Sequence, residues 1–216
     1  MKTVSYLVIL TGLVFLSCRK DPKIEIEVPY EPEPIELVTT PGSWWKYEWY
    51  RVDNYGNETF LGEQDCVFVV GDTLINGDLY THYSGDVFNF STPYNLYWRD
   101  SLHYIVTSTG TLLFSTFEQL DTLWTNTGPM HSVYALTNGT KSQVTVPAGN
   151  FMAYDREVHY YNTDGTPFTA CDSIWVKHSR FTNGIGIISE TTGFLSLIQD
   201  YCQYDEKRLV EYYIAP

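Results

Sequence analysis

The chain has 216 residues, of which 13 are Lys or Arg and 26 are Asp or Glu, so its formal net charge is −13. This acidic balance excludes proteins that bind nucleic acid or anionic lipid head groups through a basic patch. Aromatic residues are abundant, with 18 Tyr, 6 Trp and 11 Phe, and they favour the half-buried surfaces of β-sheets. Length and composition therefore predict one all-β domain with a substantial core.

Residues 1–17 have the three parts of an export signal. Lys2 gives a positive start, residues 4–16 are mostly apolar, and the small residue Ser17 stands directly before Cys18. The apolar stretch is shorter than the roughly 20 residues that cross a bilayer core, but it matches the apolar part of a signal peptide. We therefore predict a signal peptide over 1–17, cut between Ser17 and Cys18.

The sequence FLSC at residues 15–18 resembles the lipobox of bacterial lipoproteins. Phe15 stands where the usual pattern has Leu, and this looser form is similar to that of the Bacteroidetes. The resemblance implies that the Cys18 thiol carries acyl chains such as palmitate, and that the protein is lipid-anchored in the outer membrane, on its periplasmic or its cell-surface face. Several chains anchor a protein stably, since each buried methylene contributes about 0.8 kcal/mol.

The segment after the cysteine is rich in proline and acids. Pro22, Pro29, Pro32 and Pro34 alternate with glutamates and other polar residues over 18–40. Proline disfavours a helix at its own position and before it. We therefore predict an extended, solvated, acidic tether over 18–40, followed by a single antiparallel β domain over 41–216.

From residue 41 onward, short apolar runs alternate with turn signals. Residues 44–52 predict a strand, and residues 65–70 predict a central strand because they are apolar on both faces. Asn-Gly pairs at 76–77 and 138–139 predict two tight hairpins, since both residues tolerate positive φ. Further strands are expected at 96–99, 102–107, 111–115, 151–161, 172–178, 185–190, 195–204 and 208–214.

One segment also fits a short helix. Ser115 and Glu118 have the spacing of a capping box, and Phe117, Leu120 and Trp124 would share a helical face. Elsewhere the strands follow one another with tight connections, which favours an antiparallel meander. About a dozen strands in one domain should form a curved half-barrel or a barrel-like sheet.

Three motifs resemble a family of uncharacterised Bacteroidetes envelope lipoproteins. They are VTVPAGNF at 144–151, which is similar to the family's V-x-V-P-A-G-x-F turn, GIGII at 184–188 after Trp175, and GSWWKY at 42–47, which is similar to its opening strand. Trp175 is followed by VKHSR at 176–180 and not directly by the glycines, which departs from the family pattern. The resemblance implies a curved antiparallel sheet, similar to those of periplasmic lipoprotein carriers, and it implies no particular activity.

Three cysteines remain once Cys18 has taken lipid. They are Cys66, Cys171 and Cys202, so at most one disulfide forms within the chain in an oxidising compartment. Spacing does not choose the pair, and a free buried thiol at Cys66 is an equal alternative because it lies in an apolar run. The sequence holds no Cys-x-x-Cys motif and predicts neither a redox centre nor a zinc ribbon.

The histidines and acids form no recognisable catalytic or metal motif. His82, His103, His131, His159 and His178 lack the spacings that place two ligands on one metal. Strand alternation could bring His159 beside His178, and it puts Asp155 and Glu157 on one face about 7 Å apart. We interpret these groups as a solvated strand face, and residues 162–166 as a hairpin turn. We therefore predict no catalytic residue, no cofactor and no metal.

Four tripeptides resemble the Asp-Ser/Thr-aliphatic acceptor of Bacteroidetes O-glycosylation. Their hydroxyl residues are Thr73, Ser101, Thr122 and Ser173. The same tripeptide is also ordinary turn chemistry before a strand, so both interpretations stay open.

The sequence favours a non-enzymatic, lipid-anchored envelope protein. A curved sheet presents a concave aromatic face, where a hydrophobic ligand or an envelope protein would bind. The alternative is a carbohydrate-binding lipoprotein of a glycan-uptake system, in which Trp44, Trp45 or Trp98 stacks on sugar rings. A hydrolase is a third alternative, for which the sequence offers no residues. Nucleic acid is not an expected partner.

The anchor can be tested by the intact mass of the protein purified from a native host. We expect the mass of the chain from Cys18 onward plus an acyl increment, because the thiol is lipidated before the signal is removed. Any further hexose-sized increments would support use of the four acceptor sites. An unlipidated chain beginning elsewhere would contradict the lipobox interpretation.

Overall fold

The structure is a computed structural model, and it describes residues 31–53, 55–85, 94–117, 120–129, 131–170, 173–193 and 203–216. The predicted signal peptide, the lipidation site Cys18 and residues 19–30 lie outside these ranges. Among the described residues, none belongs to a helix with the length and apolarity needed to cross a membrane.

The described residues fold into β-strands joined by turns and short loops. The strands are β1 (Trp44–Val52), β2 (Glu58–Ile75), β3 (Asp78–Gly85), β4 (Tyr94–Ser101), β5 (Tyr104–Thr107), β6 (Leu112–Ser115), β7 (Asp121–Thr127), β8 (His131–Val146), β9 (Gly149–Asn162), β10 (Thr169–Ala170), β11 (Ser173–Ile174), β12 (Val176–Thr182), β13 (Gly186–Gly193) and β14 (Tyr204–Tyr213).

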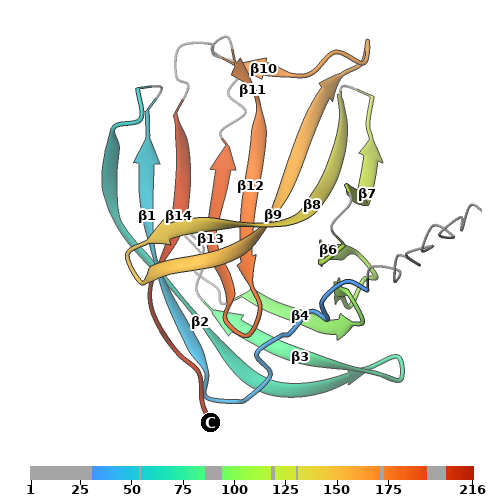
Figure 1. Ribbon diagram of the computed structural model, residues 1–216, viewed down its shortest axis with the longest axis vertical. Helices are drawn as coiled ribbons and strands as arrows, with labels where there is room; N and C mark the ends of the chain where they lie inside the picture. The colour runs from blue at the N-terminus through green and yellow to red at the C-terminus, as the bar shows by residue number, and fades with distance from the viewer. Residues whose placement is uncertain are drawn as a thin grey trace, which may run out of the picture. The chain divides into compact units, whose positions relative to one another are not determined.

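Twelve of these strands form one antiparallel sheet, in the order β6-β5-β4-β3-β2-β1-β14-β13-β12-β9-β8-β7, and β10 pairs with β11 separately. The two edge strands β6 and β7 approach each other without forming a ladder, so the sheet is nearly closed into a barrel (Figure 1). The predicted all-β class, the antiparallel meander and the barrel-like curvature are therefore confirmed.

Strand β1 lies in the middle of the sheet and shows how side chains alternate between its two faces. Trp45, Tyr47 and Trp49 are buried, whereas Trp44 and Lys46, on the opposite face, are partly exposed. Because successive strand residues point to opposite faces, the buried set faces the interior of the barrel. The predicted bounds of this strand, 44–52, are confirmed.

The first Asn-Gly turn is confirmed and the second is wrong. Asn76 and Gly77 join β2 to β3 with φ values of 54° and 95°, the left-handed pair that a two-residue hairpin needs. The pair at 138–139 instead lies inside β8, where the register against β9 shifts between Thr137 and Lys141. Gly139, with φ of 63°, therefore serves an irregularity in one long strand.

The hairpin that the sequence placed at 138–139 lies instead in the middle of the VTVPAGNF motif, where residues 147–148 join β8 to β9. Its tip reaches β14, which is not adjacent to β8 or β9 in the sheet, and there the Ala148 backbone N donates to the Leu209 carbonyl oxygen at 3.0 Å. Figure 1 shows this hairpin crossing in front of β13 and β14.

The short helix is absent from the described part of the 115–124 segment. Ser115 ends β6, residues 121–124 begin β7, and residues 118–119 lie outside the description. Phe114 is fully buried in one core cluster and Leu123 is buried in another. Cross-strand pairing of β7 with β8 thus outweighs the local helical pattern.

The predicted strand 172–178 is interrupted at Trp175. Its backbone N donates to the Phe168 carbonyl oxygen at 2.9 Å, outside the main sheet. The chain therefore forms the short β11 before this residue and β12 after it. Most of the strand expected at 195–204 lies outside the described residues.

Residues 32–40, which we call the strap, differ most from the prediction of a solvated tether. They are extended, as expected, but Ile35 and Val38 are only 3% and 7% exposed and join the hydrophobic core. The compact unit therefore begins at Pro32, ahead of the predicted boundary at residue 41. The apolar residues outweigh the prolines around them, because the barrel offers an open end to cover.

Hydrogen bonds fix the strap along its length. The Ile35 backbone N donates to the Leu102 carbonyl oxygen at 3.1 Å, and the Gly184 backbone N donates to the Glu36 carbonyl oxygen at 3.2 Å. The Tyr83 hydroxyl donates to the Val38 carbonyl oxygen at 2.7 Å. Figure 1 shows the strap in blue, running from beside β6 to the start of β1. It thus bridges turns that belong to opposite parts of the sheet.

Replacing Ile35 with Ala should destabilise the protein by about 2–4 kcal/mol, because a buried side chain is lost and a cavity remains. Urea unfolding measures the change. The matched control is Leu74→Ala at the β2–β3 hairpin, where the side chain is 70% exposed and the change should stay within about 0.5 kcal/mol. Equal effects of the two substitutions would show that the strap does not pack.

Candidate functional site

The interior of the barrel holds an apolar cavity of about 40 Å³. Its wall is built mainly from aromatic and aliphatic side chains of β1, β3, β4, the β12–β13 turn and the strap. Lining residues include Leu37, Val38, Trp45, Tyr83, Trp98 and Ile185. Since one water needs roughly 10–15 Å³ by this measure, the cavity holds a few waters and is too small for an acyl chain while the strap is in place.

The polar atoms of the aromatic wall are satisfied by backbone carbonyls. Trp45 Nε1 donates to the Ile185 oxygen at 2.7 Å, and the Tyr47 hydroxyl donates to the Ile187 oxygen at 2.8 Å. Burial raises the pKa of Tyr47 and of Tyr83, so both hydroxyls stay neutral. The wall therefore presents mainly ring faces and aliphatic groups to the cavity.

A glycine allows one of these contacts. Gly186 has a φ of 111°, and a Cβ at this position would lie 3.7 Å from Trp45 Nε1. This left-handed backbone favours glycine. The second glycine of the GIGII motif at 184–188 therefore fits the backbone conformation of the turn whose Ile185 carbonyl binds Trp45.

One end of the cavity meets a cluster of charged side chains, which we call the interior ion cluster. Glu190 on β13 is its centre, with its Oε1 at 3.2 Å from Lys177 Nζ and 3.6 Å from Arg156 Nη2, and its Oε2 at 3.4 Å from Lys207 Nζ. The Ser179 hydroxyl, fully buried, donates to Glu190 Oε1 at 3.1 Å and accepts from Arg156 at 2.7 Å. Three cations thus converge on one carboxylate.

The cluster keeps Glu190 ionised. Burial would raise the pKa of its carboxyl, but Lys207, Lys177 and Arg156 outweigh this and lower the pKa to about 2. Burial would likewise lower the pKa of Lys207, and Glu190, Tyr94 and Asp65 instead raise it. Both groups of the pair are therefore charged at neutral pH, although only 19% of Glu190 and 11% of Lys207 is exposed.

Lys207 connects the cluster to the cavity. It is a lining residue, and its ammonium lies 5.0 Å from the ring centre of Tyr47 and 5.9 Å from that of Trp49. Such positions are attractive for a cation. The interior thus combines an apolar wall with a positively charged end, inside a protein whose overall charge is negative.

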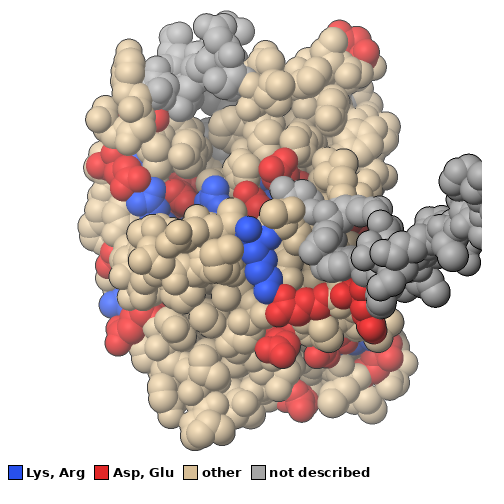
Figure 2. Space-filling view, viewed as in Figure 1, with Lys and Arg blue, Asp and Glu red and all other residues tan. Residues whose placement is uncertain are grey.

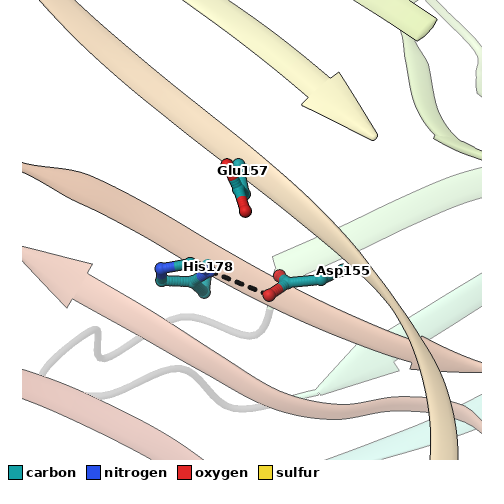
Figure 3. Close-up of side chains that lie close together, drawn as sticks. All are labelled: Asp155, Glu157 and His178. Atoms are coloured by element: carbon teal, nitrogen blue, oxygen red, sulfur yellow. Dashed lines mark hydrogen bonds and ion pairs between the residues drawn. The ribbon is translucent and has the colours of Figure 1, made fainter. Parts of the chain in front are cut away.

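A second group of side chains lies on the opposite face of the same strands. Asp155 and Glu157 of β9 alternate with the inward Arg156, and His178 of β12 lies between Lys177 and Ser179 (Figure 3). The register pairs His178 with Glu157 and Val176 with His159. His159 and His178 therefore lie on neighbouring strands but not directly opposite each other, and each contacts an acid of β9 and not the other histidine.

Direct contacts hold this outer cluster together. His178 Nδ1 lies 2.9 Å from Asp155 Oδ2, and His159 Nε2 lies 2.7 Å from Glu157 Oε2. Ligand atoms of Asp155, Glu157 and His178 all lie within 4.8 Å of one another. The spacing of these residues along the chain gave no metal motif, because the cluster is assembled across two strands.

Charged side chains are concentrated on the outer surface as well. Figure 2 shows Lys, Arg, Asp and Glu side chains across the middle of the visible face and over much of its lower half. Arg208 pairs with Glu58 at 2.7 Å on the outer face, and Arg51 pairs with Asp205 at 2.8 Å on the inward side of β1 and β14, near the ends of these strands. These partly exposed pairs keep the strands soluble and contribute little stability each.

The three tryptophans considered for sugar stacking lie in different places. Trp45 is buried, and Trp98 is partly buried in the cavity wall, so neither offers a free ring face to a sugar. Trp44 lies on the outer face, in register with Tyr213 of β14 and Phe68 of β2. Tyr213 and Phe68 are 50% and 42% exposed, so this row is an aromatic surface that the sequence did not predict.

The remaining predicted sites are placed only in part. Thr73 lies on β2, Ser101 ends β4, Thr122 lies exposed on β7, and Ser173 begins β11. Their glycosylation stays a prediction.

Cys66 is a free and exposed thiol on β2, so the alternative of a buried thiol is wrong. Its side chain points outward because Val67 and Asp65 take the inward positions. Ser17, Cys18, Cys171 and Cys202 lie outside the described residues.

Comparison with known proteins gives a likeness in structure alone. No protein-family model matches the chain, and no curated protein matches it. A Bacteroides fragilis protein named for export and for a YmcC-like fold aligns over 84% of this chain and 100% of its own, with a TM-score of 0.48 and 9% identity. A Parabacteroides distasonis protein named as a lipoprotein aligns over 83% and 99%, with a TM-score of 0.42 and 9% identity.

Replacing Glu190 with Gln should destabilise the protein by about 3–5 kcal/mol at pH 7, because the buried Lys207 and the partly buried Arg156 and Lys177 lose their counter-charge. In the wild type, the lowered pKa of Glu190 contributes about 3 kcal/mol to the free energy of unfolding above pH 4.5. This contribution is lost as the pH falls toward 2, because the carboxylate is then protonated. Urea unfolding at pH 7 and pH 3 measures both effects.

The variant should show a smaller loss of stability than the wild type between these two pH values. Glu211→Gln, at an exposed position on β14, is the control and should change stability by less than about 0.5 kcal/mol. An unchanged stability of the Glu190 variant at pH 7 would mean that the ion cluster does not support the fold.

Proposed function

We propose that this protein is a lipid-anchored, non-enzymatic protein of the bacterial outer membrane that binds the apolar chain of an amphiphilic, acidic partner inside its β domain. The observation that carries the proposal is the interior cavity, with its aromatic wall, its Lys207 end and its strap. The likeness of residues 15–18 to a lipobox supports the anchor and the compartment.

The wall determines which part of a partner would enter. Trp45, Tyr83 and Trp98 pack together, with ring centres 6.1 Å apart for Trp45 and Tyr83 and 5.2 Å apart for Tyr83 and Trp98. The polar atoms of Trp45 and Tyr83 are hydrogen-bonded within the protein, so these side chains offer the cavity mostly dispersion and hydrophobic contact. An acyl chain, free or attached to another lipoprotein, has the matching chemistry.

The Lys207 end determines which head group would be favoured. Arg156, Lys177 and Lys207 carry three positive charges, whereas Glu190 and the buried Asp65 carry two negative charges. A carboxylate or phosphate at this end would balance the remaining charge. Removal of water from the cavity would strengthen that attraction.

The strap determines when a partner could enter. Leu37 and Val38 fill part of the space that an acyl chain would need, so the strap must move before the chain binds. Only molecules with an open strap can then bind the ligand. The apparent Kd is therefore the Kd of the open form divided by the fraction of molecules that are open. The strap therefore acts as an internal occupant that a stronger apolar ligand replaces.

A second candidate function is glycan binding, which the row of Tyr213, Trp44 and Phe68 favours. Three aromatic side chains in register on neighbouring strands provide a flat surface on which sugar rings can stack. This surface is on the outside of the barrel and needs no movement of the strap.

A dansyl-labelled fatty acid tests the first proposal by fluorescence titration of the full-length protein. The detergent concentration is kept below the level at which detergent alone changes the fluorescence of the probe. Ile35→Ser should favour the open strap, because it removes an apolar side chain that packs in the core. The apparent Kd of the probe should fall about tenfold for each 1.4 kcal/mol by which the substitution shifts the free energy between the closed and open strap toward the open one. Lys207→Met should weaken binding of the acid and leave binding of the matching dansyl-labelled fatty alcohol unchanged.

Leu74→Ser, at the exposed hairpin, is the matched control for the strap variant and should bind as the wild type does. Folded wild-type and Ile35→Ser proteins that both fail to bind the probe would overturn the proposal. Binding on a glycan array that is lost in Trp44→Ala would favour the second function instead.

A further inference from the structure

We propose that Asp155, Glu157 and His178 form a binding site for a divalent transition-metal ion, with Zn²⁺ as its best-suited occupant. The three side chains come from the outer faces of β9 and β12 and place one possible ligand atom each within 4.8 Å of the others (Figure 3). Carboxylate oxygens and an imidazole nitrogen are all ligands that zinc accepts.

The strands hold the ligands in place. The backbone N of His178 donates to the Thr191 hydroxyl at 2.7 Å, and that hydroxyl donates to the His178 carbonyl oxygen at 3.3 Å. Glu157 is oriented by His159, whose Nε2 lies 2.7 Å from its Oε2. A hydrogen-bonded partner of this kind fixes a metal ligand and raises its affinity.

An unsatisfied atom gives independent support for a cation. Asp155 Oδ1 is buried, and it has no hydrogen-bond partner among the described residues. Its other oxygen, Oδ2, is taken by His178. Leaving a buried acceptor without a partner is unfavourable, and more so for a charged group. A bound cation would remove that cost.

The surrounding charges also favour a cation. The nearest positive group is Arg180, whose Nε lies 3.8 Å from Asp155 Oδ2, but its Nη1 is engaged with the Ser189 hydroxyl at 3.1 Å and with Glu206 at 3.4 Å. Arg156 and Lys177, the neighbours of the ligands in sequence, face Glu190 in the interior. Asp155 thus shares this guanidinium with Glu206.

Metal binding requires a small contraction of the cluster. Ligand atoms around a tetrahedral zinc with bonds of about 2.0 Å lie about 3.3 Å apart, which is closer than the present limit of 4.8 Å. The three side chains are 18–37% exposed, so they can adjust their rotamers. The ligating nitrogen of His178 gives up any proton to solvent, and three protein ligands leave one position for water.

Zinc binding to the full-length protein can be measured by calorimetry after chelator treatment, in a Cys66→Ser background that removes the exposed thiol as a competing ligand. We expect one zinc ion to bind per chain at the cluster of Asp155, Glu157 and His178. The melting temperature of the protein should rise with zinc concentration. His178→Gln and Asp155→Asn should each weaken zinc binding at least tenfold.

His82→Gln is the matched control, because His82 pairs with Asn95 on β3 and β4 and joins no such cluster among the residues that the structure describes. It should bind zinc as the parent does. Unfolding of each variant in chelator shows whether it folds without metal. A parent that binds no zinc, or a folded His178→Gln variant that binds it equally well, would overturn the proposal.

Discussion

The fold depends on filling the inside of a large, nearly closed sheet. About eight strands enclose an interior that side chains alone can fill, and more strands enclose more space. This sheet has twelve, and close packing does not tolerate a large void. Three features occupy the excess space: the aromatic wall around Trp45 and Trp98, the interior ion cluster around Glu190, and the strap. The cavity of about 40 Å³ is what remains.

The ion cluster and the strap fill this space in physically different ways. Glu190 and its three cations pay a desolvation cost that their mutual attraction must offset, so removal of one member leaves unpaired charge in the interior. The strap contributes mainly Ile35, Leu37 and Val38, which another apolar group could replace at little cost. The first feature is therefore suited to fix the strands, and the second is suited to exchange with a ligand. This difference is why we propose that the apolar chain replaces the strap, whereas the cluster stays in place and only its Lys207 end faces the head group.

The sequence predicted the elements whose causes are local. The alternation at 44–52 and the Asn76-Gly77 turn are fixed by neighbouring residues, and both were predicted correctly. The pair at 138–139 has the same local chemistry, but continuous pairing of β8 with β9 converts it into a strand irregularity. The helical pattern of Phe117, Leu120 and Trp124 gave way in the same manner to pairing of β7 with β8. In both cases a partner distant in the sequence decided the outcome.

The candidate sites were harder to predict for the same reason. Nothing in the proline-rich sequence of 32–40 shows that an open barrel end lies within reach of Ile35. His178 joins Asp155 and Glu157 only through the register of β9 against β12, and that register is invisible in one sequence. A signal was present in the alternation of Asp155, Arg156 and Glu157, since an arginine between two acids on a strand faces the other way. That Arg156 points inward is clear only from its contacts with Ser179 and Glu190, which come from other strands.

The same alternation ties the outer cluster to the interior. Arg156 and Ser179 point inward to Glu190, while Asp155, Glu157 and His178 point outward from the same two strands. A slip of one residue in this pairing would bury both acids and expose the arginine, because the side-chain period of a strand is two. The interior ion cluster therefore specifies the register on which the outer ligands depend. A metal ion bound outside would in turn stabilise the strand pairing that brings the interior charges together, since both sets of contacts form only in the same register.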